Sequence, residues 1–249
     1  MNILGHSYIA TKCILGNRDL LIIGSLLPET APFIANNPFT YDEIHEGGEK
    51  LFEFLSKKYP QMKDLALGMI THSYKSGADG WNKRIEKYAG DKREEILKEI
   101  VEASKINFKI APTRLHNFLW WGVDFLILQN YPKFVNEVGQ ALTNVKVEEI
   151  ARLLSECFKK DNQEVLRIFK ILFGEIYQVK DLNSVAGLAH IWARQAAGLP
   201  ENDRVDVKKA TKLIEKTAFL LKKDFSRILN FVIKETKKNI ELLPSFRKL

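Results

Sequence analysis

Apolar residues recur at intervals of three and four along most of the chain, which is the spacing of one face of an α-helix. No alternation of apolar and polar residues is long enough to predict a strand. The pattern therefore predicts an all-α fold, with one multi-helix domain of orthogonal or bundle-like packing across residues 1–249. The expected helices cover residues 3–15, 42–58, 61–75, 92–106, 112–129, 131–142, 146–158, 162–177, 182–197 and 205–242.

One segment interrupts this helical pattern. Residues 24–41, GSLLPETAPFIANNPFTY, contain several prolines and no regular period, so we expect an ordered loop there. Loops of this length inside a compact domain are uncommon and often functional. The last helix, 205–242, is expected to bend or break near Asp224.

Length and composition narrow the class of protein. With 249 residues, 45% of them hydrophobic, the chain can bury one sizeable core. Its two cysteines, Cys13 and Cys157, form no CxxC motif and favour a reducing compartment. The N-terminus lacks the pattern of a signal peptide, and the longest apolar runs fall short of the roughly 20 residues needed to span a bilayer. We therefore expect a soluble, cytoplasmic protein.

Charge is distributed unevenly. The formal net charge is +7, and residues 201–249 hold 13 Lys and Arg against 7 Asp and Glu, so nearly all of the excess lies in the last fifth. A long basic C-terminal helix could contact a membrane surface or another anionic partner such as nucleic acid. The simpler interpretation is a solvated, lysine-rich helix face. Nothing in the sequence indicates an obligate protein partner.

The histidines form the main chemical signal. Four of them fall on the apolar stripes of four separate expected helices, where helical geometry turns them inward: His6, His45, His72 and His116. Helix bundles commonly build metal sites from such inward histidines and from carboxylates on facing helices. Each histidine taken alone is also compatible with a hydrogen-bonded core position. The fifth, His190, has no such partner, and we interpret it as structural.

Three carboxylates lie where such a site needs them. Glu29 is in the irregular loop, Asp79 follows His72 by seven residues, and Asp124 lies in the most apolar helix, where a lone charge is costly. The alternatives are an ordinary Asp-Gly turn at Asp79 and an ion pair of Asp124 with Arg114 or a lysine. Histidine and carboxylate ligands together suit Zn²⁺. Our candidate metal ligands are His6, Glu29, His45, His72, Asp79, His116 and Asp124, and Glu29 and Asp79 are also candidate catalytic bases.

Several common catalytic motifs are missing. The sequence contains no Walker A loop, GxGxxG, GxSxG or HExxH. The run HEGGE at residues 45–49 begins like the last of these, but Glu49 stands where the second histidine should be. Neither a dinucleotide-binding protein nor a serine hydrolase is therefore indicated.

Five short fragments occur in a recognisable order: GHSYIA, GSLLPE, IHEGGEKLF, GMITHSYKSGAD and RLHNFLWWGVD. Over residues 1–130 this order resembles the zinc-dependent phospholipase C and S1/P1 nuclease superfamily, and most of all its short prokaryotic members without a signal peptide. The resemblance implies an all-α fold that binds up to three zinc ions among its helices and hydrolyses phosphodiesters in phospholipids or nucleic acids. Residues 131–249 would complete that fold.

Carried over to this chain, the resemblance assigns metal-ligand roles to His6, His45, His72 and His116. Glu29 stands where the family usually has Asp. Two positions differ, because the fourth residue after His72 is Ser76 in place of Asp, and the fourth after His116 is Trp120 in place of Glu. Asp79 and Asp124 are the available substitutes. This set implies one or two zinc ions, or another divalent metal, rather than three.

Three functional hypotheses follow. The first is a metal-dependent hydrolase of phosphate esters, phospholipase C-like or a phosphodiesterase, with a phosphate-ester or phospholipid substrate. In it the loop 24–41 walls the cleft, and aromatic side chains supply its apolar surface: Phe33, Phe39, Trp81, Trp120 and Trp121. The second is a non-catalytic relative of the same fold that serves as a metal-binding or interaction scaffold. A third possibility is a helical adaptor that binds through its basic C-terminal helix.

Overall fold

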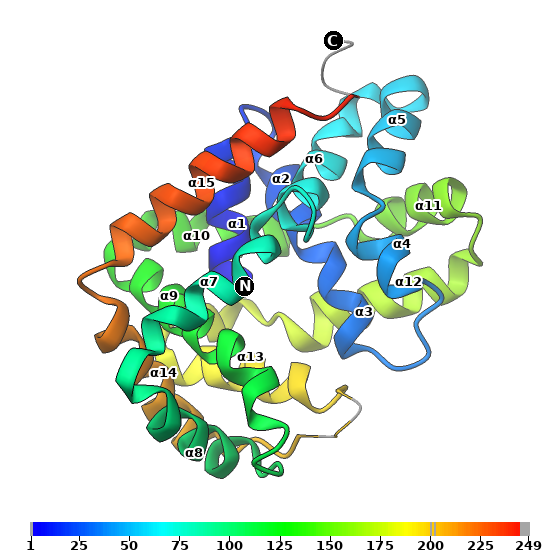
Figure 1. Cartoon of the computed structure of the whole chain (residues 1–249). Coiled ribbons are helices and arrows are strands. Elements are labelled where there is room, and N and C mark those ends of the chain that lie inside the picture. The colour runs from blue at the N-terminus through cyan, green and yellow to red at the C-terminus, as the bar shows by residue number, and fades with distance from the viewer. Residues whose placement is uncertain (1, 200, 202, 245–249) are drawn as a thin grey trace.

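The computed structural model of this chain describes residues 2–199, 201 and 203–244, apart from the side chain of Pro32. The described residues form helices joined by short turns, with no strand among them, and the helices cross one another in several directions (Figure 1). One continuous hydrophobic cluster joins them. The expected all-α fold with a single core is thereby confirmed.

The first half of the chain contains most of the short helices. In chain order its elements are α1 (Ile3–Cys13), α2 (Arg18–Leu26), η1 (Leu27–Glu29), α3 (Thr30–Phe33), α4 (Tyr41–His45), α5 (Gly48–Lys58), η2 (Pro60–Met62), α6 (Lys63–His72), η3 (Ala78–Trp81), α7 (Asn82–Ile85), η4 (Glu86–Lys92), α8 (Arg93–Ser104), η5 (Ala111–Arg114) and α9 (Leu115–Asn130).

The second half packs around the first. Its elements are α10 (Pro132–Thr143), α11 (Val147–Phe158), α12 (Asn162–Lys170), the π-helical turn η6 (Ile171–Ile176), η7 (Val179–Asn183), α13 (Val185–Ala196), α14 (Val207–Leu221) and α15 (Phe225–Glu241). Helix α14 packs on α8 and α9, α10 packs on α2, and α15 packs on α1. The expected break near Asp224 is present between α14 and α15.

Helix α1 is the central helix of the molecule. Residues 3–11 are buried around its whole circumference, and it packs against α2, α6, α9, α10 and α15. A helix that is apolar on all sides can be accommodated only in the middle of a core. His6, in the second turn of α1, is therefore deep inside the protein.

Helices α2 and α6 cross at very short distance because each has a glycine at the crossing. A Cβ atom on Gly24 would lie 2.0 Å from the carbonyl oxygen of Leu65, and one on Gly68 would lie 2.3 Å from that of Leu21. Glycine is thus the one residue type that fits at either position. The crossing brings the end of α2, which leads to Glu29, beside the end of α6, which is His72.

The loop expected over residues 24–41 is largely wrong. Residues up to Leu26 belong to α2, and residues 27–33 form η1 and α3. Pro28 does not interrupt the helical structure because it lies in the first turn of η1, where a missing N–H group costs no hydrogen bond. The part that remains irregular is residues 34–40.

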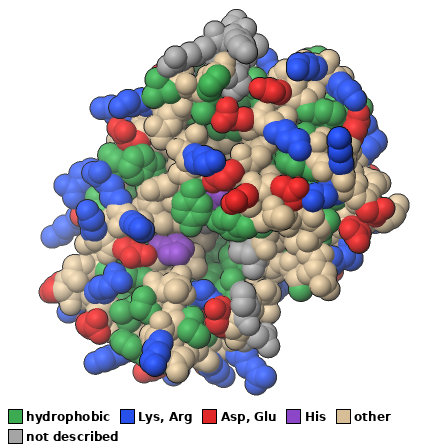
Figure 2. All heavy atoms as spheres, turned by 45° about the vertical axis from the view of Figure 1, so that its right-hand side comes forward, with side chains coloured by type: hydrophobic (Ala, Val, Ile, Leu, Met, Phe, Trp, Pro, Cys, Tyr) green, Lys and Arg blue, Asp and Glu red, His purple; other side chains and the backbone are tan. Residues whose placement is uncertain are grey.

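The surface shows little of the histidine cluster. On the face seen in Figure 2, acidic, basic and apolar side chains are interspersed, and histidine appears in small areas only. None of the described helices combines the length and the apolar character that crossing a membrane requires.

Candidate metal centre

Five of the seven candidate ligands converge in the core, each from a different element. The structure brings together one side chain each from α1, η1, α4, α6 and η3: His6, Glu29, His45, His72 and Asp79. They form two overlapping groups, His6–Glu29–His72 and His45–His72–Asp79, and within each group one ligand atom per residue lies within 4.8 Å of the others. Both groups are buried and share His72.

The orientation of His72 is fixed by the main chain of α2. Its Nδ1 lies 2.7 Å from the carbonyl oxygen of Ser25, a distance at which the ring donates its proton to that oxygen. The proton on Nδ1 leaves the lone pair on Nε2, which points toward Asp79 Oδ2 at 3.6 Å. A histidine held in this way by a carbonyl group has the tautomer and orientation that metal-ligating histidines use.

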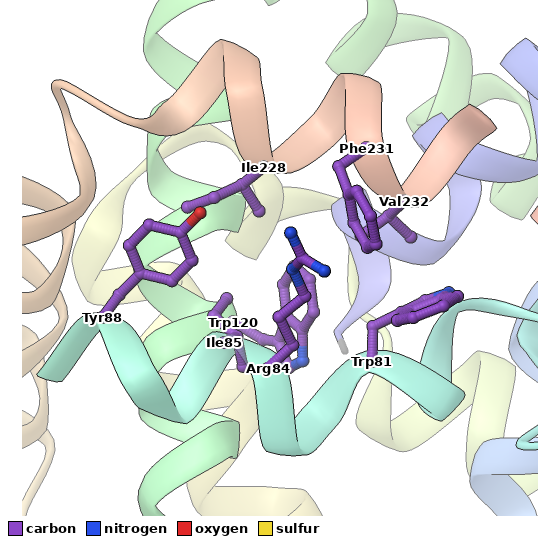
Figure 3. A pocket seen from close by; sticks show the side chains of 8 residues that line it. All are labelled: Trp81, Arg84, Ile85, Tyr88, Trp120, Ile228, Phe231 and Val232. Atoms are coloured by element: carbon purple, nitrogen blue, oxygen red, sulfur yellow. The ribbon is translucent and has the colours of Figure 1, made fainter. Parts of the chain in front are cut away.

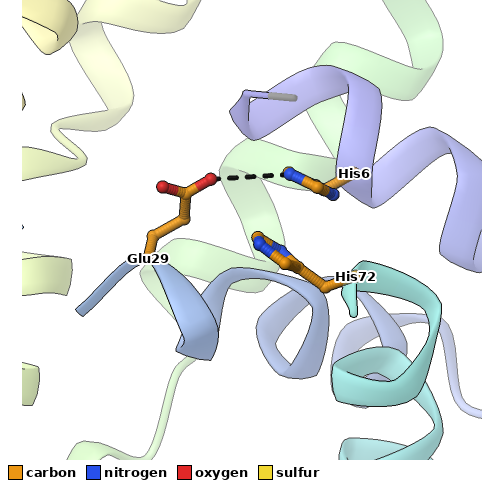
Figure 4. A group of neighbouring side chains, drawn as sticks. All are labelled: His6, Glu29 and His72. Carbon is orange, nitrogen blue, oxygen red and sulfur yellow. Dashed lines mark ion pairs between the residues drawn. The ribbon is translucent and has the colours of Figure 1, made fainter. Parts of the chain in front are cut away.

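His6 lies flat against His72 and has no hydrogen bond of its own. The two rings stack with centroids 3.6 Å apart. Among the described residues neither nitrogen of His6 has a hydrogen-bond partner. Its Nε2 lies 3.5 Å from Glu29 Oε1 (Figure 4) and also 3.5 Å from Asp79 Oδ1. A buried polar group without a hydrogen bond is costly. A cation between His6, Glu29 and His72 would remove that cost.

Asp79 reaches the histidines because the chain folds back after α6. A Cβ atom on Gly77 would lie 2.4 Å from the carbonyl oxygen of Thr71, so the turn packs directly on the helix end and requires glycine. Asp79 then lies 3.1 Å from His45 Nε2 and within 3.6 Å of the other two histidines. The carboxylate that Ser76 does not supply in register is therefore supplied from three residues further along the chain. Asp79 is 8% exposed and is more than an ordinary turn residue.

Glu46 orients His45 and was not recognised in the sequence. Its Oε1 lies 3.3 Å from Nδ1 of His45 and accepts the N–H of Tyr74 at 2.8 Å. It therefore fixes the imidazole, whose Nε2 faces Asp79, and ties α4 to the turn after α6. A carboxylate directly after a candidate histidine ligand is the signal that could have identified it.

Burial governs the protonation of the two stacked histidines. It lowers the pKa of His6 well below its usual value and that of His72 to about 3, and a charge on His45 lowers both further. Both imidazoles are therefore neutral near pH 7, which is the form that binds a metal ion.

The other three candidate ligands, Glu29, His45 and Asp79, differ in whether they hold a proton at neutral pH. Burial raises the pKa of Glu29 to about 8. Burial disfavours a charged His45, but hydrogen bonds to Asp79 and Glu46 outweigh it and raise its pKa to about 9. Burial also opposes ionisation of Asp79, yet nearby positive charge and the hydrogen bond from protonated His45 hold its pKa well below the usual value. Before a metal ion binds, Glu29 and His45 thus each hold a proton at neutral pH.

Asp124 is fully buried but bonds to the main chain. Its two carboxylate oxygens accept the N–H groups of Leu4 at 2.9 Å and Gly5 at 2.8 Å, so it caps the start of α1. It belongs to neither group of converging ligands. The expected alternative, an ion pair with Arg114, is also wrong, since Arg114 pairs with Asp203 at 2.9 Å.

His116 lies outside the converging set. Its Nδ1 is 3.6 Å from Glu86 Oε1, and about a quarter of its side chain is exposed. It occupies the first turn of α9, at the edge of the apolar stripe, where the helix has just emerged from η5. The stripe therefore predicted the side of the helix correctly but not how deeply its first turn is buried.

The expected aromatic wall belongs to other parts of the fold. Trp120 and Trp121 are fully buried in the core, and Trp120 donates its Nε1 proton to Asn82 at 2.7 Å. Trp81 and Trp120 line a pocket between η3–η4 and α15 that none of the five converging ligands touches (Figure 3). Arg84 lies in that pocket over the ring of Phe231 at 3.6 Å, which leaves about 10 Å³, room for about one water molecule.

Two tyrosines cover His45 instead. Tyr41 and Tyr74 stack on its ring with centroids 4.6 and 5.0 Å away, and both are nearly half exposed. Tyr41 precedes His45 by four residues, the spacing that places two side chains on one helix face. Both exposed rings thus contact a candidate metal ligand directly.

No protein-family model matches the chain, and neither a curated protein nor a solved structure matches it.

Proposed function

We propose that this chain is a zinc-dependent hydrolase of phosphate esters, related to the phospholipase C and S1/P1 nuclease superfamily that its motifs resemble. The observation that supports this proposal is the convergence of three buried imidazoles and two carboxylates from five elements. The order of these residues along the chain is the order in which the resembling motifs occur.

The donor atoms fit a divalent metal ion. Imidazole nitrogen and carboxylate oxygen suit Zn²⁺, and His6 and His72 are held neutral by burial. Within the described part of the chain neither nitrogen of His6 has a hydrogen bond, and Nδ1 of His72 is engaged by the carbonyl oxygen of Ser25. Because one lone pair on His72 binds one ion, the two overlapping groups cannot both be complete three-ligand sites at once. This supports one firmly held ion, with any second ion bound by fewer protein ligands.

The two carboxylates, Asp79 and Glu29, suit different roles. Asp79 contacts all three histidines, which suits a ligand, whereas Glu29 contacts His6 alone among them. Burial gives Glu29 a pKa of about 8 in the metal-free chain. A zinc ion bound beside it would release that proton and leave the carboxylate that a general base needs. A zinc ion bound here would supply Lewis-acid activation of water and of a phosphate ester. Glu29 would take the proton from the attacking water, and substrate would approach past Tyr41 and Tyr74.

The test is hydrolysis of a chromogenic phosphodiester and a chromogenic phosphomonoester by the zinc-loaded protein. We expect activity that a chelator removes and added zinc restores. His72→Ala and Glu29→Gln should each lower the rate by at least about a hundredfold. His116→Ala is the matched control and should keep the rate, because His116 lies outside the converging set.

A non-catalytic metal-binding scaffold is the second candidate. It is favoured by the burial of the converging ligands, none of which is more than 8% exposed, and by Ser76 and Trp120 at two carboxylate positions of the resembling family. A protein that holds zinc firmly but hydrolyses neither substrate would support this candidate over the enzyme.

A further inference from the structure

Phe219 is the most exposed aromatic side chain among the described residues, at 82% of its full accessibility. It lies in the last turn of α14, on the helix face directed away from α9. The other residues of that exposed face are charged: Lys208, Lys212, Glu215 and Lys222. A large apolar side chain is thus presented to solvent in the middle of a row of charges.

Positive charge predominates around Phe219. The nearby carboxylates of α8 are already engaged, since Lys216 pairs with both Glu95 and Glu99. Lys222 and Lys223 stand three and four residues after Phe219, are exposed, and have no ion pair with any described residue. They are available to an anionic partner.

Beside Phe219 the surface is hollowed between the start of α8 and the end of α14. The hollow has a volume of about 490 Å³. Its apolar lining is Ile96, Phe219 and Leu220. Four lysines and one carboxylate stand around it, and that carboxylate, Glu95, is paired with Lys92 and Lys216. We call Lys92, Phe219, Leu220, Lys222 and Lys223 the Phe219 corner. It combines an apolar tip, an apolar floor and a basic rim.

This combination matches the surface of an anionic bilayer. Interfacial proteins place an aromatic or aliphatic side chain at the boundary of headgroups and acyl chains while lysines pair with anionic headgroups. Single-stranded nucleic acid is instead held by grooves with successive aromatic platforms. Phe219 is the one aromatic side chain among the described residues lining this hollow, so the lipid surface is favoured.

We propose that the Phe219 corner docks this protein on an anionic lipid surface, with Phe219 entering the headgroup layer and Lys222 and Lys223 facing anionic headgroups. The docking is peripheral, since none of the described helices is suited to cross a bilayer. It does not depend on the metal centre, to which the corner contributes no ligand.

The test is flotation of the full chain with vesicles of phosphatidylcholine alone or mixed with phosphatidylserine. We expect binding to the mixed vesicles that falls as salt is raised, and little binding to phosphatidylcholine. Lys222→Glu with Lys223→Glu should weaken binding by roughly tenfold or more. Phe219→Ala should weaken it by a similar factor of about ten, since its apolar contact is lost.

Matched controls keep the test specific. Phe108→Ala removes another exposed phenylalanine, and Lys57→Glu with Lys180→Glu makes the same charge change on α5 and η7. Both should bind like the wild type. Equal losses in the controls, no binding to mixed vesicles, or retention of binding in the Phe219 corner variants would each overturn the proposal. Tighter salt-dependent binding to a single-stranded oligonucleotide than to vesicles, lost in the same variants, would overturn it in favour of nucleic acid.

Discussion

The imidazole of His72 is fixed by the main-chain carbonyl of Ser25, which accepts the Nδ1 proton over 2.7 Å. This one bond joins the end of α6 to the end of α2 and leaves Nε2 for Asp79 and for a metal ion. It exists because Gly24 and Gly68 allow the two helices to cross without intervening side chains. The helix crossing and the ligand geometry are therefore one feature of the fold.

Glu46 should matter to metal affinity without being a ligand. Glu46→Gln keeps the shape of the side chain but removes its negative charge. In the wild type the charged carboxylate holds His45 and accepts the N–H of Tyr74. We expect metal affinity to fall by roughly 10- to 100-fold, as for other partners of metal-binding histidines. Competition with a chromogenic chelator measures this. Glu49→Gln, which changes a carboxylate of α5 that belongs to neither group of converging ligands, should leave affinity unchanged; an equal loss there would count against the assignment.

Gly77→Ala should damage both the fold and the centre. Its Cβ would lie 2.4 Å from the carbonyl oxygen of Thr71, so the turn that delivers Asp79 has to shift. We expect a loss of about 1–3 kcal/mol in the free energy of unfolding, together with weaker metal binding. Urea denaturation and metal titration test this. At Gly174 a Cβ meets no atom within 4 Å, so Gly174→Ala should be close to neutral, and a similar loss there would refute the steric explanation.

Asp124→Asn separates a structural role from a ligand role. An amide has one oxygen in place of two, so it cannot accept the N–H groups of both Leu4 and Gly5 in the same way. We expect unfolding to become easier by about 1–3 kcal/mol while the bound metal per chain stays the same. Loss of metal from a folded Asp124→Asn protein would instead make Asp124 a ligand.

Stability of the metal-free protein should depend on pH in a defined direction. The folded pKa of Glu29, about 8, and that of His45, about 9, both exceed their ordinary values of 4.5 and 6.5. Between pH 6.5 and 9 the folded chain therefore holds protons that the unfolded chain has released. The free energy of unfolding should fall as pH rises through this window, by up to about 1.4 kcal/mol per pH unit for each such proton.

The histidines with lowered pKa do not alter that window. The contribution of His6 and His72 to the free energy of unfolding changes with pH only below 6.5. That of Asp79 changes only below its ordinary pKa of 3.8. A zinc ion bound at the proposed centre would displace the protons of Glu29 and His45, so its stabilising effect should grow as pH rises. Denaturation with and without zinc at several pH values tests both trends. A metal-free stability that rises from pH 6.5 to 9 would contradict the assigned protonation states.

The helices were largely predictable because the three-and-four spacing of apolar residues reflects burial of one helix face. Helix α2 was not predicted because its sequence lacks this spacing. Its LLIIGSLLP run is apolar on all sides and is followed by prolines, and neither feature gives a period. The sequence contains Gly24 and Gly68, but it does not show which helix packs against each of them.

The histidine stripes indicated which side of each helix faces inward. They could not indicate what each side chain meets there. His6, His45 and His72 meet one another and two carboxylates, whereas His116 meets Glu86 near the surface. Asp124 was rightly expected to need a partner in an apolar helix. That partner is the start of α1, a contact between residues about 120 positions apart that no local pattern reports.

Metal content of the purified protein tests the central proposal most directly. Elemental analysis of the wild type and of His72→Ala, with His116→Ala as the control, should find about one equivalent of zinc in the wild type and the control and much less in His72→Ala. Added zinc should raise the melting temperature of the metal-stripped wild type. A wild-type protein that contains no zinc, manganese or iron, and whose melting temperature none of these metals raises, would contradict the metal centre.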